Sequence, residues 1–254
     1  MSIWGVIPAA GLGTRIQPLA FSKELLPVGT RYDGETERPR AVCEYLIDRM
    51  LQAGATRICF VISAEKTDIL NYFGGQIGGA PICYAVQQNP SGLCDAIFTA
   101  LPFLSPGDEV LVGLPDTVWF PEDAFQHLPQ HKFSFLLFPV ERPELFDAVM
   151  TDDHDRVLEV QVKTRAATTK WVWGAFRLPA EDLRNLNELW EERNRQDQYI
   201  GTLVNEYINR GAAVHAVRRG ETYVDVGTLH GYREAVKLLS RENRQYTDEF
   251  NVAA

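Results

Sequence analysis

The stretch that decides the fold is VIPAAGLGTRIQPLAFSKELLPVG, residues 6–29. It begins with a short apolar run, which is typical of a strand buried on both faces of a parallel sheet. Gly11 and Gly13 then break the run, because glycine allows the tight turns with positive φ that can follow such a strand. Arg15 and Lys23 place two positive charges close behind the turn. Backbone N–H groups in a glycine turn, with cations nearby, favour a phosphate-binding loop over a plain turn.

Downstream of this stretch, apolar runs alternate with amphipathic ones. RICFVIS (residues 57–63) and EVLVGLPD (residues 109–116) are nearly continuous apolar runs, and helical patterns at residues 40–53 and 93–101 precede them. This rhythm predicts an α/β fold, an open sheet covered by helices. Ligands of such sheets bind outside the carboxyl ends of the strands, where the glycine turn and Asp116 both fall.

The second half of the chain is less regular. Closely spaced strand-like runs between residues 133 and 178 predict an antiparallel part of the sheet. Trp171 and Trp173 alternate along one of these runs, which favours a packed face over contact with a ligand. The whole chain, residues 1–254, is interpreted as one domain with its core at 3–240 and a short tail at 241–254. The polar segment 29–40 is either a mobile flap or an ordinary surface insertion.

Composition excludes several classes of protein. The 254 residues carry a net charge of -9 without a long basic run, so nucleic acid is not an expected partner. The apolar runs are too short to span a membrane, and no membrane partner is expected. The four cysteines lack CxxC spacing and indicate reduced core thiols in a cytoplasmic protein rather than a zinc site.

The glycine turn closely resembles the signature of the sugar-phosphate nucleotidyltransferases, in particular the uridylyl- and thymidylyltransferases that act on glucose 1-phosphate. Segments QQNPSGLCDAI (87–97), GLPDT (113–117) and VDVGTLHGYREA (224–235) resemble further motifs of that family in the same order. The resemblance implies a three-layer α/β/α nucleotide-binding fold, Rossmann-like and of GT-A type, with a mostly parallel mixed sheet. It also implies an enzyme that joins an NTP, with UTP or dTTP favoured, to a sugar 1-phosphate, giving an NDP-sugar and pyrophosphate.

The same resemblance assigns roles to individual positions. Catalysis of this reaction is positioning and charge neutralisation, because the attacking phosphate oxygen is already ionised. The positions implied are Arg15, Lys23 and Lys163 for catalysis; Ala10, Gly11, Gly13, Thr14, Arg15, Gln87 and Gly92 for the nucleotide; Lys163 and Gly174 for the sugar phosphate; and Asp116 and Asp225 for Mg²⁺. The expected partners are the NTP and the sugar 1-phosphate, and the chain is expected to form a homo-oligomer.

The sequence departs from the family pattern around the acceptor sugar. Val162 stands where the family has a sugar-binding glutamate beside the lysine, and Thr164 replaces a proline. Ala148 stands where a sugar-contacting glycine is usual. Valine accepts no hydrogen bond from a hydroxyl group, so glucose 1-phosphate is not the expected acceptor. The alternative is a catalytically silent, nucleotide-binding regulatory relative, which would have lost a charged residue of the site; the sequence retains them all.

Overall fold

The computed structural model describes residues 1–32, 34–89 and 91–252, with side chains described as far as residue 240. Its strands are β1 (Ile3–Pro8), β2 (Pro27–Tyr32), β3 (Glu37–Ala41), β4 (Arg57–Ser63), β5 (Gln76–Ile77), β6 (Ala80–Gln87), β7 (Glu109–Gly113), β8 (Thr117–Phe120), β9 (Ser134–Pro139), β10 (Asp147–Thr151), β11 (Val157–Val162), β12 (Trp171–Pro179), β13 (His215–Val217) and β14 (Thr222–Asp225). Its α-helices are α1 (Val42–Gln52), α2 (Thr67–Phe73), α3 (Leu93–Phe98), α4 (Ala180–Glu192), α5 (Ile200–Asn209) and α6 (Leu229–Val252). Short 3₁₀ helices lie at Lys23–Leu25, Leu101–Phe103, Ala124–His127 and Pro143–Leu145.

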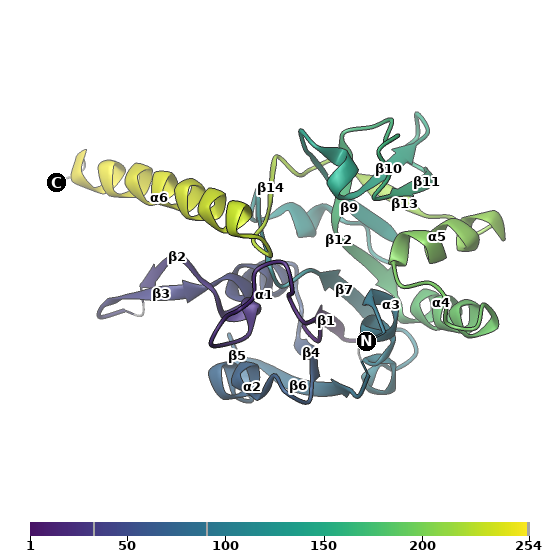
Figure 1. Ribbon diagram of the computed structural model, residues 1–254, viewed down its shortest axis with the longest axis horizontal. Coiled ribbons are helices and arrows are strands. Elements are labelled where there is room, and N and C mark those ends of the chain that lie inside the picture. Colours follow the sequence, from purple (N-terminus) through teal and green to yellow (C-terminus); the bar gives the residue numbers. More distant parts are fainter. Residues whose placement is uncertain (33, 90, 253–254) are drawn as a thin grey trace.

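Within the described residues, ten strands form the main sheet, in the order β11-β10-β12-β7-β1-β4-β6-β5, with β9 beside β12 and β13 beside β9. Strands β7, β1, β4 and β6 are parallel. Strand β12 pairs antiparallel with β7, β9 and β10. The predicted mixed sheet is therefore confirmed, with its parallel strands at the centre and the antiparallel part contributed by the second half of the chain (Figure 1).

Helices cover both faces of this sheet, because successive side chains of each central strand point to opposite faces. In β1, Trp4 and Val6 pack in one cluster with residues of α3, α4 and α5. Ile7 packs in a second cluster with residues of α1 and α2. All three side chains are buried. The prediction of three layers is confirmed, and burial on both faces explains why the central strands are apolar without interruption.

The strand order brings three chain segments to one edge of the sheet. Strands β1 and β7 are parallel neighbours, so the glycine turn after Pro8 and the segment after Gly113 lie at the same edge. A separate two-stranded sheet, β8 with β14, continues from there and pairs Thr117 with Asp225. Asp116 and Asp225 therefore become neighbours although 109 positions separate them in the sequence.

Most of the segment 29–40 belongs to a hairpin: residues 29–32 lie in β2 and residues 37–40 in β3, and these strands pair antiparallel. Val28 of β2 packs with Ala235 and Leu239 of α6. Figure 1 shows this hairpin and the yellow helix α6 extending together away from the sheet. Thr228 caps α6, because its Oγ1 accepts a hydrogen bond of 3.0 Å from the N–H of Gly231.

The segment expected to be a tail, residues 241–254, continues α6 to Val252. Its last two positions, 253–254, lie outside the described residues. None of the helices in the described part of the chain combines the length and apolar character needed to cross a bilayer.

Candidate active site

The loop after β1 carries two cations toward the carboxyl edge of the sheet. Gly13 has a φ of +66°, and a Cβ on it would lie 2.9 Å from Cδ of Lys23. A glycine is therefore required here for two reasons: the backbone is left-handed, and the loop passes directly over the Lys23 side chain. The close approach explains why the glycine turn and Lys23 occur together in the sequence.

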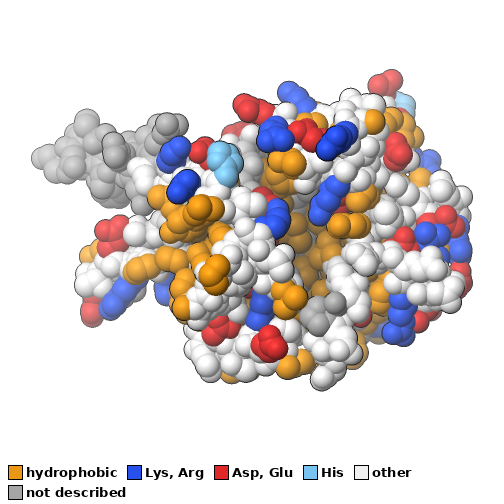
Figure 2. Space-filling view, in the orientation of Figure 1, with side chains coloured by type: hydrophobic (Ala, Val, Ile, Leu, Met, Phe, Trp, Pro, Cys, Tyr) orange, Lys and Arg blue, Asp and Glu red, His pale blue; other side chains and the backbone are white. Residues whose placement is uncertain are grey.

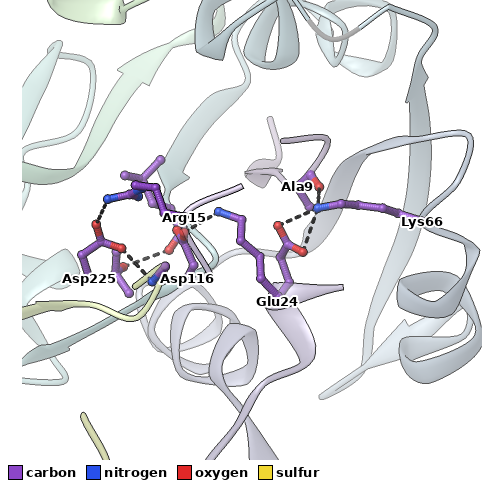
Figure 3. Close-up of polar contacts among 10 residues, drawn as sticks. Ala9, Arg15, Glu24, Lys66, Asp116 and Asp225 are labelled. Carbon is purple, nitrogen blue, oxygen red and sulfur yellow. Dashed lines mark hydrogen bonds and ion pairs between the residues drawn. The ribbon is translucent and has the colours of Figure 1, made fainter. Parts of the chain in front are cut away.

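Each of these cations meets one of the two predicted metal-binding aspartates. Lys23 Nζ forms an ion pair with Asp116 Oδ2, and Arg15 Nη1 lies 2.8 Å from Asp225 Oδ2. Figure 3 shows Arg15 and Asp225 facing each other, with Asp116 beside them. The structure thus brings together the four charged residues to which the family resemblance assigns phosphate binding and metal binding.

The two carboxylates also lie close to each other. A Cβ built on Gly227 would be 2.8 Å from both Asp116 Oδ2 and Asp225 Oδ1, so these oxygens are no farther apart than twice that distance. The N–H of Gly227 donates to Asp225 Oδ1 at 2.8 Å and fixes that carboxylate. A Cβ there would also lie 3.1 Å from Arg15 Nη2, so a side chain at 227 would crowd all three groups. Two hard oxygen donors this close together fit Mg²⁺, which takes a few carboxylates and completes its shell with phosphate oxygens.

Burial and pairing have opposite effects on the charges of the site. Burial alone raises the pKa of Asp116, but the charge and hydrogen bond of Lys23 outweigh it and hold that pKa below its usual value. Burial lowers the pKa of Lys23, but Asp116 and Glu24 outweigh it and the pKa of Lys23 is raised. Both groups are therefore charged at neutral pH, and Asp116 is ionised as a metal ligand must be.

A second, fully buried ion pair supports the loop. Lys66 Nζ lies 2.9 Å from both carboxylate oxygens of Glu24 and donates to the Ala9 carbonyl at 2.6 Å (Figure 3). Ala9 directly follows β1, and Glu24 directly follows Lys23, so one ammonium group holds both ends of the loop that carries Arg15. The sequence contains no local signal for this pair, because a lone lysine and a lone glutamate 42 residues apart resemble ordinary surface charges.

A cavity of about 380 Å³ is lined by the two paired cations and their carboxylates, Arg15, Lys23, Asp116 and Asp225. Figure 2 shows a hollow near the middle of one face, with hydrophobic side chains inside it and Lys and Arg side chains at its edge. Lys163 lines the cavity from the end of β11, its backbone N–H donating to the Phe146 carbonyl at 3.1 Å. The predicted site residues that line this cavity are Arg15, Lys23, Gly92, Asp116, Lys163 and Asp225.

The remaining predicted positions lie elsewhere within the described residues. Ala10 is buried, and Gly11 and Thr14 are exposed on the loop. Gly174 lies behind the cavity: a Cβ on it would be 2.5 Å from the ring of Tyr223 and 2.7 Å from that of Phe138. The structure therefore gives Gly174 a packing role, in which it lets Tyr223 reach the cavity wall.

Gln87 borders a second hollow, of about 360 Å³, beyond Gly92. Its Nε2 donates a hydrogen bond to the Asp95 carboxylate, and its side chain is almost fully buried. Asp95 takes up one of the two N–H donors of the amide, so Gln87 keeps one N–H donor and the acceptor Oε1. Contact between Gln87 and a nucleotide base stays a prediction.

Gly92 also has a structural requirement that the sequence did not reveal. Its φ is +108°, and a Cβ on it would lie 2.9 Å from the backbone oxygen of Gln198. We expect Gly92→Ala to lower the free energy of unfolding by more than about 1 kcal/mol, because alanine is strained at positive φ and the backbone of Gln198 must move. Chemical denaturation of this variant beside Gly75→Ala, whose new Cβ would meet nothing within 4 Å, provides the measurement. Equal stability of the two variants would contradict this account.

Several residues of the cavity wall were not predicted. Trp173 is 95% buried and packs in the core, as predicted for the alternating tryptophans, yet it also lines the cavity. Tyr199 lies with its ring centroid 4.6 Å from Lys163 Nζ. Asp147, the first residue of β10, lines the cavity as well. Its only sequence signal was its position next to Ala148, one of the departures from the family pattern.

Known proteins resemble this chain in sequence and in fold. The model of a family described as Nucleotidyl transferase matches residues 4–242. A glucose-1-phosphate thymidylyltransferase of Neisseria meningitidis is 27% identical over 92% of this chain and 82% of its own length. The UTP–glucose-1-phosphate uridylyltransferase AglF of Haloferax volcanii is 24% identical over 96% of this chain and 99% of its own.

The fold is shared with solved structures. A UTP-bound UGPase of Acinetobacter baumannii superposes with a TM-score of 0.77 at 20% identity, covering 98% of this chain and 99% of the other. The chain belongs to the nucleotidyl transferase family. Within it, the relatives are sugar 1-phosphate nucleotidyltransferases, enzymes of nucleotide-sugar biosynthesis that bind an NTP and a sugar phosphate.

Proposed function

We propose that this chain transfers a nucleotidyl group from UTP or dTTP to a sugar 1-phosphate and releases pyrophosphate, with Mg²⁺ bound by Asp116 and Asp225. The observation that carries the proposal is the convergence of Arg15 and Lys23 with both aspartates at a cavity that Lys163 also lines. The proposal includes catalysis, because all five charged residues needed for the chemistry are present, which disfavours a silent regulatory relative.

The proposed reaction requires positive charge that offsets the repulsion between the phosphate groups of the two substrates. Two polyanions must approach each other, and at about 4 Å each pair of like charges costs on the order of 4 kcal/mol at an effective dielectric constant near 20. Arg15 would hold the phosphates that leave as pyrophosphate, Lys23 the reacting phosphates, and Lys163 the acceptor phosphate. Magnesium, when bound, neutralises further charge on the phosphate oxygens. The acceptor phosphate is ionised already, so its attack requires positioning rather than a general base.

The preference for UTP or dTTP is supported by Gln87. Uracil and thymine present an N3–H donor, whereas cytosine presents an acceptor at that position. An amide with one N–H bonded to Asp95 keeps a second N–H donor and a carbonyl oxygen, which match a ring carbonyl and the N3–H of these two bases. The two nucleotides differ from each other by a methyl group and a hydroxyl group, about which the described contacts say nothing.

The proposed acceptor is a sugar 1-phosphate, or another phosphorylated alcohol, different from glucose 1-phosphate. Val162 and Ala148 occupy the positions where the family resemblance places sugar contacts, and Val162 packs toward Gly201 in the fold. A valine side chain supplies no acceptor for a sugar hydroxyl. Loss of such a contact changes discrimination strongly when the remaining site is polar.

Pyrophosphate release measured across a panel of NTPs and sugar 1-phosphates tests the proposal. We expect turnover with UTP or dTTP, with a sugar 1-phosphate other than glucose 1-phosphate preferred. Removal of Mg²⁺ by a chelator is expected to abolish turnover, and its return to restore it, because two aspartates alone add negative charge to an anionic reaction. Absence of turnover with every pair, while the NTP still binds, would establish the silent alternative. Preference for glucose 1-phosphate would overturn the proposed acceptor.

A further inference from the structure

Asp147 lines the cavity, and one of its carboxylate oxygens is buried without a partner. Its residue is 92% buried, and Oδ1 has no hydrogen bond within the described residues. The other oxygen, Oδ2, accepts a hydrogen bond of 3.4 Å from Nε1 of Trp173. A buried carboxylate normally has its acceptor sites filled, because an unfilled one carries the full cost of leaving water. A buried carboxylate oxygen without a partner, on a residue that lines a cavity, is accounted for when the cavity's occupant supplies the donor.

The strand register places this carboxylate next to the phosphate-binding lysine. Strands β10 and β11 are antiparallel, and Asp147 stands directly opposite Val162, the residue before Lys163. The hydrogen bond from the Lys163 N–H to the Phe146 carbonyl joins the two strands at that point. The resemblance expects a sugar-binding carboxylate at 162. This chain has valine there, and a carboxylate at the paired position of the neighbouring strand.

The charges around Asp147 indicate which donor fits. Burial raises the pKa of Asp147, and the nearby charge of Lys163, the hydrogen bond from Trp173 and the backbone of Lys163 offset this only in part. A second cation at this position would be repelled by Lys163, which the acceptor phosphate needs. A neutral hydroxyl group donates without that penalty. The aromatic rings of Phe146 and Trp173, which line the same cavity, suit the apolar faces of a sugar ring.

We propose that Asp147 determines acceptor specificity: its Oδ1 accepts a hydrogen bond from a ring hydroxyl of a neutral pyranose 1-phosphate. This inference rests on the proposed function, and it names the group that does the work of the missing carboxylate at 162. The proposal excludes an amino sugar that places its ammonium group at Asp147 as the acceptor.

The test compares the accepted sugar 1-phosphate with its monodeoxy analogues on wild type, Asp147→Ala and Asp147→Asn. On wild type, one analogue is expected to lose roughly 100-fold in kcat/KM, since a hydrogen bond to a charged group is removed. In Asp147→Ala, kcat/KM for the parent sugar 1-phosphate should fall by about the same factor. In that variant, changing from the parent sugar to the same analogue should lower kcat/KM by less than about threefold more. The KM for the NTP should be unchanged. Asp147→Asn keeps an acceptor oxygen and the side-chain shape, so we expect an intermediate loss.

Asp153→Ala, which replaces an exposed aspartate of the following turn, is the matched control and should behave as wild type. The inference is overturned if every analogue loses the same factor on wild type and on Asp147→Ala, or if an amino sugar 1-phosphate is preferred and loses its preference in Asp147→Asn. If wild type turns over no NTP and sugar pair, the proposed function fails. The role of Asp147 is then tested separately by measuring the equilibrium binding of the same sugar phosphates to wild type and to Asp147→Ala. Equal affinity of the two proteins would overturn that role.

Discussion

Lys23→Met is expected to lower kcat/KM by about 1000-fold, the upper range for removing one preorganised group that stabilises developing charge. The same substitution should lower the free energy of unfolding by about 3–5 kcal/mol, because it leaves Asp116 as a buried carboxylate without its partner. Pyrophosphate release and chemical denaturation measure the two effects. Lys132→Met, at an exposed lysine, makes the same chemical change away from the site and should alter neither.

A double variant separates the two roles of Lys23. Lys23→Met with Asp116→Asn removes both charges of the pair, so most of the lost stability should return. Activity should not return, because a cation and a metal ligand are then both missing. Recovery of activity in the double variant would show that Lys23 acts only by neutralising Asp116. A Lys23→Met protein as active as Lys132→Met would remove Lys23 from the chemistry altogether.

Lys66→Met is expected to destabilise the fold by about 3–5 kcal/mol at pH 8, because Glu24 is then a fully buried charge without a partner. Burial raises the pKa of Glu24, and Lys66 provides the largest effect that lowers it. Without Lys66 that pKa rises further above its unfolded value. Between the two values the folded state binds more protons than the unfolded state, so stability falls as the pH rises.

Chemical denaturation at pH 5 and pH 8 therefore measures both the loss of unfolding free energy in Lys66→Met and the direction in which that loss changes with pH. The deficit of Lys66→Met relative to wild type should be smaller at pH 5, where a carboxyl with a raised pKa is neutral when folded. Lys66→Met with Glu24→Gln should show little pH dependence. A deficit that is the same at both pH values would mean that Glu24 is not ionised in the native protein.

Much of the site could be predicted because its residues follow strands whose order is encoded locally. The apolar run of β1, the glycine turn and the apolar run of β7 are each visible in a short window, and parallel strands bring their carboxyl ends together. Arg15, Lys23 and Asp116 were found in this way. Asp225 reaches them through the antiparallel pairing of β14 with β8, which periodicity does not predict, so it was identified only by the family resemblance.

The residues that were missed depend on contacts between distant segments. Glu24 and Lys66 become significant only once β4 and the first loop are packed together. Asp147 is one acid in a region rich in acids, and only the register of β10 against β11 places it at the cavity. Gln87 was predicted for its side chain, but its amide orientation depends on Asp95, which belongs to the next helix. Such pairings form only in the tertiary structure, and no local sequence pattern predicts them.

The paired charges of the cavity also affect which solutes it retains. Lys23 is largely buried and already paired with Asp116, so a lone orthophosphate or sulfate ion that binds Lys23 must compete with that carboxylate. In the proposed reaction, a nucleoside triphosphate with its magnesium would supply phosphate oxygens to Lys23 and the metal to Asp116 together. We therefore expect this ion pair to disfavour small anions at Lys23 relative to a nucleoside triphosphate that carries magnesium.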